Sequence, residues 1–224
     1  MECITFAFLH YTVAVFYSIG GIMYFQYGER EITALKQCDK RLAALIERIG
    51  EIKRPLTPDL FTALVKNIIE QQISISAAIT VNQRLLNLCE GTYTPERVIK
   101  LSEQEIQQCG MTMRKANYII GIADAVISEK LNLNKIPDLT DKEVIDTLTQ
   151  LKGIGIWTAE MLLISSLNRP DILSWGDLAI QRGIMRLYRH KTLDKARFER
   201  YRKRYSPYGS TASLYLWALS KKPE

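Results

Sequence analysis

The stretch LKGIGIWTAEMLLISSLNRPDILSWGD, residues 151–177, decides the fold of this chain. Its glycines, Gly153 and Gly155, flank one apolar residue, a helical run begins near Trp157, and Asp177 follows a Pro-containing loop. Because glycine adopts positive φ without a steric penalty, Gly-x-Gly between two apolar helices predicts a very tight turn. Backbone N–H groups at such a turn can hold an anion such as phosphate. The glycines alone fit an ordinary helix–turn–helix corner equally well.

Length and composition place the chain among globular proteins. Its 224 residues suffice for one large or two modest domains, and 47% of them are hydrophobic, with few Gly and Pro. The cysteines are far apart and form no CxxC pair, which predicts buried, reduced thiols without disulfides or a metal cluster. The chain has only two histidines, which argues against His-based metal sites and Ser/His/Asp catalysis. The cysteines are Cys3, Cys38, Cys89 and Cys109.

Positive charge is concentrated in residues 182–204. This segment has ten Lys and Arg against two acids, a local charge of +8, whereas the whole chain carries +6. A basic segment of this kind indicates a polyanionic partner, most often nucleic acid, although a well-solvated helix face also explains it.

The first residues form a separate problem. Residues 4–25 are almost entirely apolar and long enough to span a membrane. A signal peptide is less favoured, because the segment before them carries Glu2 and no Lys or Arg. A true start at Met23 explains the sequence as well, so membrane anchoring is an alternative that we do not favour.

The rest of the chain has helical periodicity. Asp39 predicts an N-cap inside the segment 29–49, Gly50 a helix end, and the pair Ser102 and Glu105 a capping box. No run alternates polar and apolar residues with turn signals, as strands do. We therefore predict an all-α chain.

Further segments match a known family: FQYGEREI (25–32), IIEQQIS (68–74) and YSPYGSTASLYLW (205–217). Together with residues 151–177, they resemble the helix-hairpin-helix–GPD superfamily of DNA glycosylases, and within it the 3-methyladenine DNA glycosylase II family. The resemblance spans about residues 24–217. It implies a two-domain helical fold with a DNA-binding cleft between the domains. The expected division is an extension, 1–22, a terminal domain, 23–58 with 168–224, and a central helical bundle, 59–167.

The resemblance implies a catalytic role for Asp177. Hydrolysis of an N-glycosidic bond requires a stabilised oxocarbenium-like sugar and an activated water, and one carboxylate can contribute to both. A plain helix N-cap is the other interpretation of Asp177, and Asp171 is the nearest rival. Bifunctional relatives place a Lys where this chain has Trp157, so the resemblance implies a monofunctional enzyme that leaves the strand intact.

The same resemblance assigns a pocket for a flipped, alkylated purine. Electron-rich rings favour stacking with a cationic base. The implied pocket residues are Trp157, Trp217, Met161, Tyr24 and Phe25. Met161 stands where close relatives often carry an aromatic residue. Gly209 stands where they carry an Arg, whose charge we expect Arg202 or Arg204 to supply.

Contacts with double-stranded DNA are implied at three places. Gln71, Gln72 and Ile73 match the loop that fills the gap left by the flipped nucleotide, and Gly153, Gly155 and Thr158 match phosphate contacts, with Arg182 nearby. The carbonyl groups of Thr149, Leu151 and Ile154 are implied ligands of a non-catalytic cation. The resemblance implies no catalytic cofactor, and no Cys follows Cys109 to hold an iron–sulfur cluster.

The resemblance therefore implies a monomeric enzyme of base excision repair, acting on 3-methyladenine-type lesions in the cytoplasm at the nucleoid. Two alternatives stay open. One is a glycosylase for another damaged or mismatched base, and the other is a non-catalytic helix-hairpin-helix DNA-binding protein. A binding protein would need the hairpin and the basic segment but neither Asp177 nor the aromatic pair.

Overall fold

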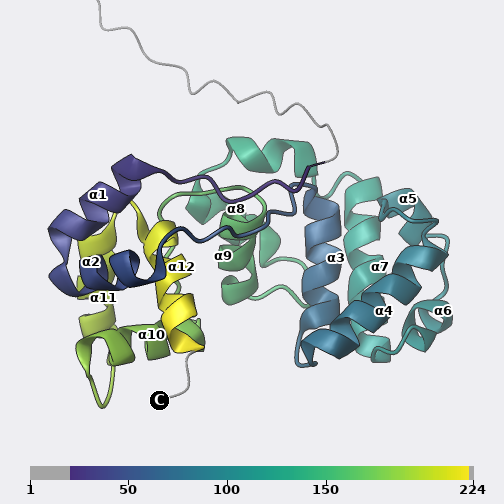
Figure 1. Ribbon diagram of the computed structural model, residues 1–224. Helices are drawn as coiled ribbons and strands as arrows, with labels where there is room; N and C mark the ends of the chain where they lie inside the picture. The colour runs from purple at the N-terminus through teal and green to yellow at the C-terminus, as the bar shows by residue number, and fades with distance from the viewer. Residues whose placement is uncertain (1–20, 222–224) are drawn as a thin grey trace, which may run out of the picture.

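The computed structural model describes residues 21–221, and this part of the chain is helical without strands, as predicted. One isolated bridge pairs Tyr24 with Pro55. Figure 1 shows α1, α2, α10, α11 and α12 at one end, α3 to α7 at the other, and α8 and α9 between them. The helices are α1 (Glu29–Cys38), α2 (Lys40–Ile49), α3 (Leu60–Glu70), α4 (Ile75–Leu88), α5 (Pro95–Val98), α6 (Glu103–Gln108), α7 (Met113–Ile127), the 3₁₀ helix η1 (Leu133–Asp138), α8 (Asp141–Leu148), α9 (Ile156–Ser165), α10 (Leu178–Tyr188), α11 (Lys195–Tyr205) and α12 (Gly209–Ser220).

The helix boundaries follow the local signals in the sequence. The Asp39 carboxylate accepts the N–H groups of Arg41 and Leu42 and caps α2, and Gly50 ends that helix with φ 75°. Ser102 and Glu105 form the predicted capping box at α6. These predictions are confirmed. They could be made from the sequence because each depends on only a few neighbouring residues.

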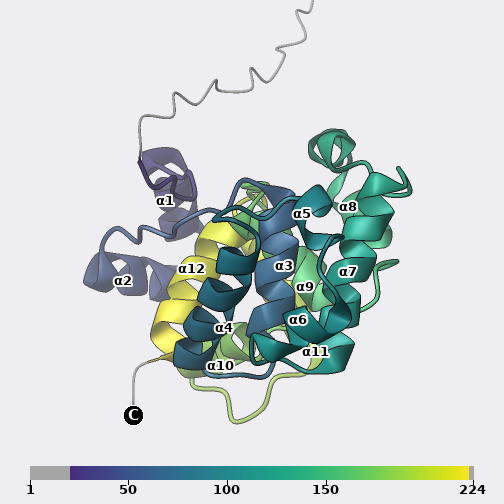
Figure 2. The same ribbon diagram turned by 90° about the vertical axis from the view of Figure 1, so that its right-hand side faces the viewer.

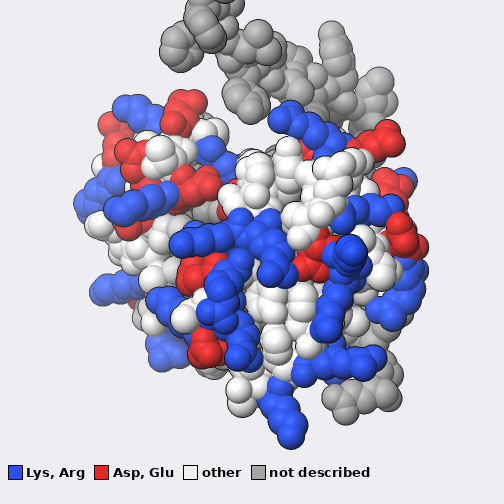
Figure 3. Space-filling view, turned by 90° about the vertical axis from the view of Figure 1, so that its left-hand side faces the viewer, with Lys and Arg blue, Asp and Glu red and all other residues white. Residues whose placement is uncertain are grey.

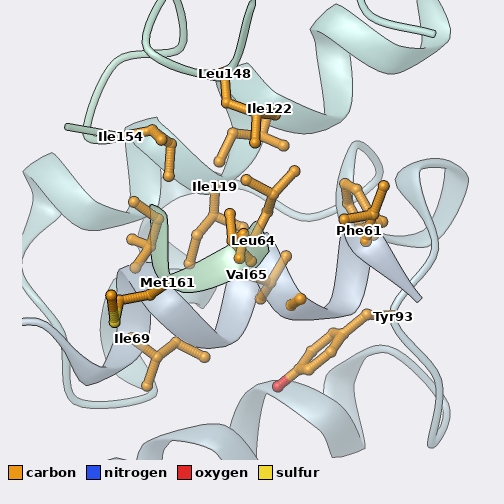
Figure 4. Close-up of a cluster of buried hydrophobic side chains, with 14 of the residues drawn as sticks. Phe61, Leu64, Val65, Ile69, Tyr93, Ile119, Ile122, Leu148, Ile154 and Met161 are labelled. Carbon is orange, nitrogen blue, oxygen red and sulfur yellow. The ribbon is translucent and has the colours of Figure 1, made fainter. Parts of the chain in front are cut away.

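Two apolar clusters hold the helices together. The first, here named the central core, gathers buried residues mainly from α3 to α9, and Figure 4 shows part of it around Leu64 and Ile119. The second, the terminal core, gathers residues from α1, α2 and α10 to α12. Figure 2 shows α3, α4, α7 and α9 from the side of the central core. The predicted domain boundaries stay a prediction, because Phe25, Ile172 and Leu214 lie outside 59–167 and yet belong to the central core.

A close helix crossing joins the middle of α10 to α12. A Cβ at Gly183 would lie 2.4 Å from the carbonyl oxygen of Leu216, so only glycine lets these backbones approach so closely. Trp217 is the next residue on α12, and it packs against both cores. This crossing holds Trp217 on the side of α10 where its indole reaches the N-cap, Asp177.

Two sequence expectations concern the surface and the N-terminus. Cys38, expected to be buried, is exposed at the end of α1, whereas Cys89 and Cys109 are buried as expected. The apolar segment 4–25 and Cys3 lie outside the described residues, apart from positions 21–25. Between residues 21 and 221, every helix is too short or too polar to cross a membrane.

Candidate active site

The glycine turn lies between α8 and α9, as the sequence predicts. Gly153 has φ 91°, and a Cβ there would lie 2.3 Å from the ring of Tyr118, so both the conformation and the space require glycine. Ile154 is buried in the central core and anchors the turn. Gly155 is the N-cap of α9 and supplies no side-chain cap. Free backbone N–H groups at the first turn of α9 therefore remain available to an outside acceptor.

Asp177 is the N-cap of α10 and is almost fully buried, with 6% of its surface exposed. Its Oδ1 atom accepts the N–H groups of Ala179 and Ile180 at 2.8 and 2.9 Å. Its Oδ2 atom accepts the indole Nε1–H groups of Trp157 and Trp217, each at 3.1 Å. The four donors occupy the roughly four lone-pair sites of a carboxylate. They fix Asp177 in place without adding a positive charge.

A pocket of about 360 Å³ opens beside this carboxylate. This volume lies at the small end of the roughly 300–1,000 Å³ that is typical of ligand sites. Its apolar wall contains Trp157, Trp217 and Met161, and its other residues are mostly polar or charged. A larger hollow of about 970 Å³ lies along α7 and the turn after α8, but Asp177 does not line it. The pocket beside Asp177 is also lined by Arg54, Pro55, Thr57, Ala63, Lys66, Asn67, Glu70, Ser165, Asp177 itself and Lys221.

Arg54 is one of several pocket residues that the sequence did not predict. Its guanidinium lies over the ring of Trp217, with Cζ 4.6 Å from the ring centroid. Burial lowers the pKa of Arg54, and the charges of Asp177 and Glu70 partly oppose that shift. Neither acid forms an ion pair with Arg54 within the described part of the chain. In sequence, Arg54 lies in a Pro-rich linker, and no local signal marks its position in the pocket.

Of the other residues predicted for the site, some line the pocket and others lie outside it. Met161 lines the pocket, but Tyr24 and Phe25 do not, and Phe25 is buried in the central core. Asp171 is a loop residue that accepts hydrogen bonds from Ser206 and from the N–H of Gly209. It does not line the pocket.

A second acid, Glu160, lies near Asp177 without facing the pocket. Its carboxyl group is hydrogen-bonded to the hydroxyl of Ser174. Burial raises the pKa of Glu160, and the charge of Asp177 adds to the increase. Among the acids near the pocket, Asp177 is therefore the one that combines burial, fixed geometry and a place in the wall.

The loop after α3 lies next to the glycine turn. The side-chain amide of Gln71 donates to the carbonyl of Gly153 at 2.9 Å. Lys115 donates to the carbonyls of Ile69 and Gln71, at 2.8 and 2.6 Å, and so holds the end of α3 in place. Gln72 is exposed with φ 56°, and Ile73 is 38% exposed. The exposed tip therefore lies beside the hairpin, as a contact with the same ligand would require.

The residues predicted to contact phosphate differ in how exposed they are. Gly155 and the first turn of α9 reach the surface, but Thr158 is only 4% exposed, and burial leaves its hydroxyl little access to a phosphate. Arg182 is exposed. No residue of the basic segment 182–204 lines the pocket. Figure 3 shows Lys and Arg gathered across the middle of the face on the side of α1, α2 and α11.

Part of the basic segment serves the fold. Arg204 forms an ion pair with the buried Asp39 at 2.6 Å, and Arg202 lies 3.7 Å from Glu199. Neither side chain is therefore an uncommitted replacement for the Arg expected at Gly209.

The predicted cation site uses backbone carbonyls of the hairpin. The Leu151 carbonyl accepts the N–H of Ile154 at 3.1 Å, which closes the turn and leaves a second lone pair on the oxygen. This arrangement is compatible with a cation at Thr149, Leu151 and Ile154, which stays a prediction. Within residues 21–221, no three His, Cys, Asp or Glu side chains are grouped as a metal site would require.

Comparisons with known proteins give a consistent result. Residues 65–207 match the model of the HhH-GPD superfamily base excision DNA repair proteins. DNA-3-methyladenine glycosylase 1 of Schizosaccharomyces pombe is 32% identical over 200 residues, which cover 86% of each chain.

Solved structures agree with this match. A DNA-3-methyladenine glycosidase from Bacillus halodurans superimposes with a TM-score of 0.80 and 36% identity, covering 90% of this chain and 94% of that one. The S. pombe 3-methyladenine DNA glycosylase in complex with abasic DNA has a TM-score of 0.78 and 30% identity, covering 86% and 97%.

Proposed function

The chain belongs to the HhH-GPD superfamily of base excision DNA repair proteins, and we propose that it is a monofunctional DNA glycosylase for alkylated purines. The proposed substrate is a base of the 3-methyladenine type in double-stranded DNA, which is the base that its relatives are named for. The enzyme would hydrolyse the N-glycosidic bond and leave an abasic site in an intact strand. It would act as a monomer without a catalytic cofactor.

The observation that carries the proposal is the state of the Asp177 carboxylate. It is buried in the pocket wall, hydrogen-bonded by four uncharged N–H donors, and without an ion-pair partner among the described residues. A fixed negative charge in a site of low dielectric constant stabilises a positive charge that develops next to it. The sugar acquires such a charge at C1′ as the base departs.

The same geometry favours one of two roles for Asp177. A general base must accept a proton from water, but the four N–H donors already occupy the acceptor sites of this carboxylate. We therefore assign Asp177 to electrostatic stabilisation of the oxocarbenium-like sugar. Water would add to C1′ once the base has left and would lose its proton to solvent.

The base would be flipped out of the duplex and held in the pocket. Trp157 is 43% exposed and offers a ring to the base, whereas Met161 supplies a polarizable side chain. Each tryptophan would then have two tasks, because its indole N–H also holds Asp177.

DNA would be bound through the hairpin and the adjacent loop. The N–H groups after Gly155, which no side chain caps, would bind a phosphate, and Ile73, at the exposed tip beside Gly153, would fill the gap that the base leaves. Arg182 and other exposed residues of the basic segment would contribute phosphate contacts. Binding should therefore weaken as salt rises.

The experiment is a product assay on the full chain. Duplex DNA treated with a methylating agent should release free 3-methyladenine, and the strand should break only after alkali opens the abasic site. Borohydride should trap no covalent protein–DNA adduct. This control matters because Lys66 and Lys221 line the pocket. Release of no base would refute glycosylase activity, and a trapped adduct would refute monofunctional chemistry.

A further inference from the structure

Arg54 contains a buried donor without a partner. Its Nε–H is shielded from solvent and has no hydrogen-bond acceptor in the structure. The guanidinium stacks on Trp217 and forms part of the pocket wall, next to Asp177 in the lining. A polar group that is buried and unpaired destabilises the fold, so its presence in a native structure calls for an explanation.

Arg54 differs in this respect from Arg97, a comparable half-buried arginine. Arg97 donates to the carbonyl of Cys89 at 3.1 Å and lies 3.3 Å from the carboxylate of Glu90. It stabilises the loop before α5 and does not line the pocket. The requirements of the fold therefore explain Arg97, whereas they leave the donor of Arg54 unused.

The Nε–H of Arg54 is itself shielded, but the same guanidinium lines the pocket and donates no hydrogen bond to another residue within residues 21–221. A base in the pocket would give the terminal N–H groups of this guanidinium an acceptor. When the C1′–N9 bond of a purine nucleotide breaks, its electron pair goes to the base. A cationic alkylated base departs as a neutral molecule, but an uncharged base departs as an anion. A guanidinium donor stabilises an anion much more than it stabilises a neutral molecule.

Building on the function proposed above, we propose that Arg54 donates a hydrogen bond to an acceptor atom of the flipped base and stabilises the electron density that this base gains as it leaves. Arg54 is thus a specificity-determining residue. Asp177 acts on the positive sugar, and Arg54 acts on the departing base. The enzyme depends on Arg54 most when the lesion carries no positive charge.

The test compares two lesions in one duplex sequence, with 7-methylguanine as the cationic base and hypoxanthine as the uncharged one. The variant is Arg54→Met, which keeps an unbranched chain on Trp217 but removes all donors. We expect the single-turnover rate for hypoxanthine to fall tenfold to a hundredfold, on the order of one charge-assisted hydrogen bond. The rate for 7-methylguanine should change by no more than about threefold.

Thermal unfolding separates this role from structural support of Trp217. Arg54→Met should keep or raise the melting temperature, because it removes an unpaired buried donor. Arg97→Met, the matched control, should lower the melting temperature and leave the ratio of the two rates unchanged.

Equal loss of rate on both lesions, no loss on either, or a wild-type enzyme inactive on hypoxanthine would each overturn the role of Arg54. A wild-type protein that releases neither base contradicts the proposed function itself. The two failures are therefore distinguishable.

Discussion

Two aspartates of this molecule have the same local geometry and different surroundings. Asp39 is the N-cap of α2 and Asp177 is the N-cap of α10, and each is 6% exposed. In both, Oδ1 accepts two backbone N–H groups, and Oδ2 accepts two side-chain donors. By burial and capping alone, the two residues cannot be told apart.

The difference lies in the charge of the donors. Asp39 accepts from the hydroxyl of Tyr188 and from Arg204, which neutralises it. Asp177 accepts from two uncharged indoles and faces a pocket. A compensated buried carboxylate stabilises the fold, whereas an uncompensated one in a pocket wall can stabilise a cation that enters. Substitutions at Asp39 and Asp177 test this difference directly.

The largest expected effect is on catalysis. Asp177→Asn keeps the cap but removes the charge, so the single-turnover rate of base release should fall about 10³-fold or more. Asp39→Asn should change that rate by less than about threefold, because Asp39 touches no pocket residue. Similar rate losses in both variants would remove the distinction between the two sites. Retained binding of duplex DNA by each variant is the control for folding.

The second effect is on stability, where substitution of Asp39 should cost more than substitution of Asp177. Asp39→Asn leaves Arg204 without its counter-ion, and we expect the free energy of unfolding in urea to fall by about 2 kcal/mol. This figure is below the range for fully buried pairs because the Arg204 side chain is 43% exposed. Asp177→Asn separates no ion pair, but its amide NH2 group would face the two indole N–H groups and leave them without this acceptor. Because Trp157 is 43% exposed and water can replace part of the loss, the cost should be about 1 kcal/mol. A larger loss at Asp177 would show that its main role is structural.

The third effect concerns the donors. Trp217→Phe keeps an aromatic ring but removes one N–H from Asp177, and we expect base release to slow about tenfold. Tyr188→Phe removes one donor from Asp39 and should lower stability without slowing release. If Trp217→Phe leaves the rate unchanged, the indole N–H does not position the carboxylate.

The smallest effect is a pH dependence. Burial by itself raises the pKa of Asp39, but hydrogen bonds from Tyr188, the N–H of Leu42 and Arg204 together bring it below the ordinary value of 3.8. A depressed folded-state pKa contributes stability above the unfolded-state value, and this contribution is lost as the pH falls through the folded-state value. The stability difference between wild type and Asp39→Asn should therefore shrink below about pH 4. A constant difference from pH 7 to pH 3 contradicts the ion pair.

Local rules were sufficient for much of the fold. The caps at Asp39 and Ser102, the end at Gly50 and the turn at Gly153 each follow from neighbouring residues. The position of Asp177 after the hairpin also identified it as the candidate acid. The pairing of each aspartate with its donors lay beyond such rules, because Trp157 and Trp217 are separated from Asp177 by 20 and 40 positions.

Other residues show the same limit. Arg54 lies in a linker, and only the tertiary fold places it over Trp217. Thr158 and Phe25 matched the family pattern, yet packing buries both of them. Hydrophobic periodicity predicts which face of a helix is buried, but contacts between distant helices determine which polar atoms meet.

The most direct measurement is the affinity for a charged sugar analogue. A duplex with a protonated pyrrolidine in place of the abasic sugar mimics the cation at C1′, and a tetrahydrofuran analogue is its neutral control. The wild type should bind the charged duplex about 10²-fold more tightly or better. Asp177→Asn should lose this preference, and Asp39→Asn should keep it. If Asp177→Asn keeps the preference, the charge of Asp177 is not what stabilises the sugar, and the electrostatic role assigned to Asp177 is wrong.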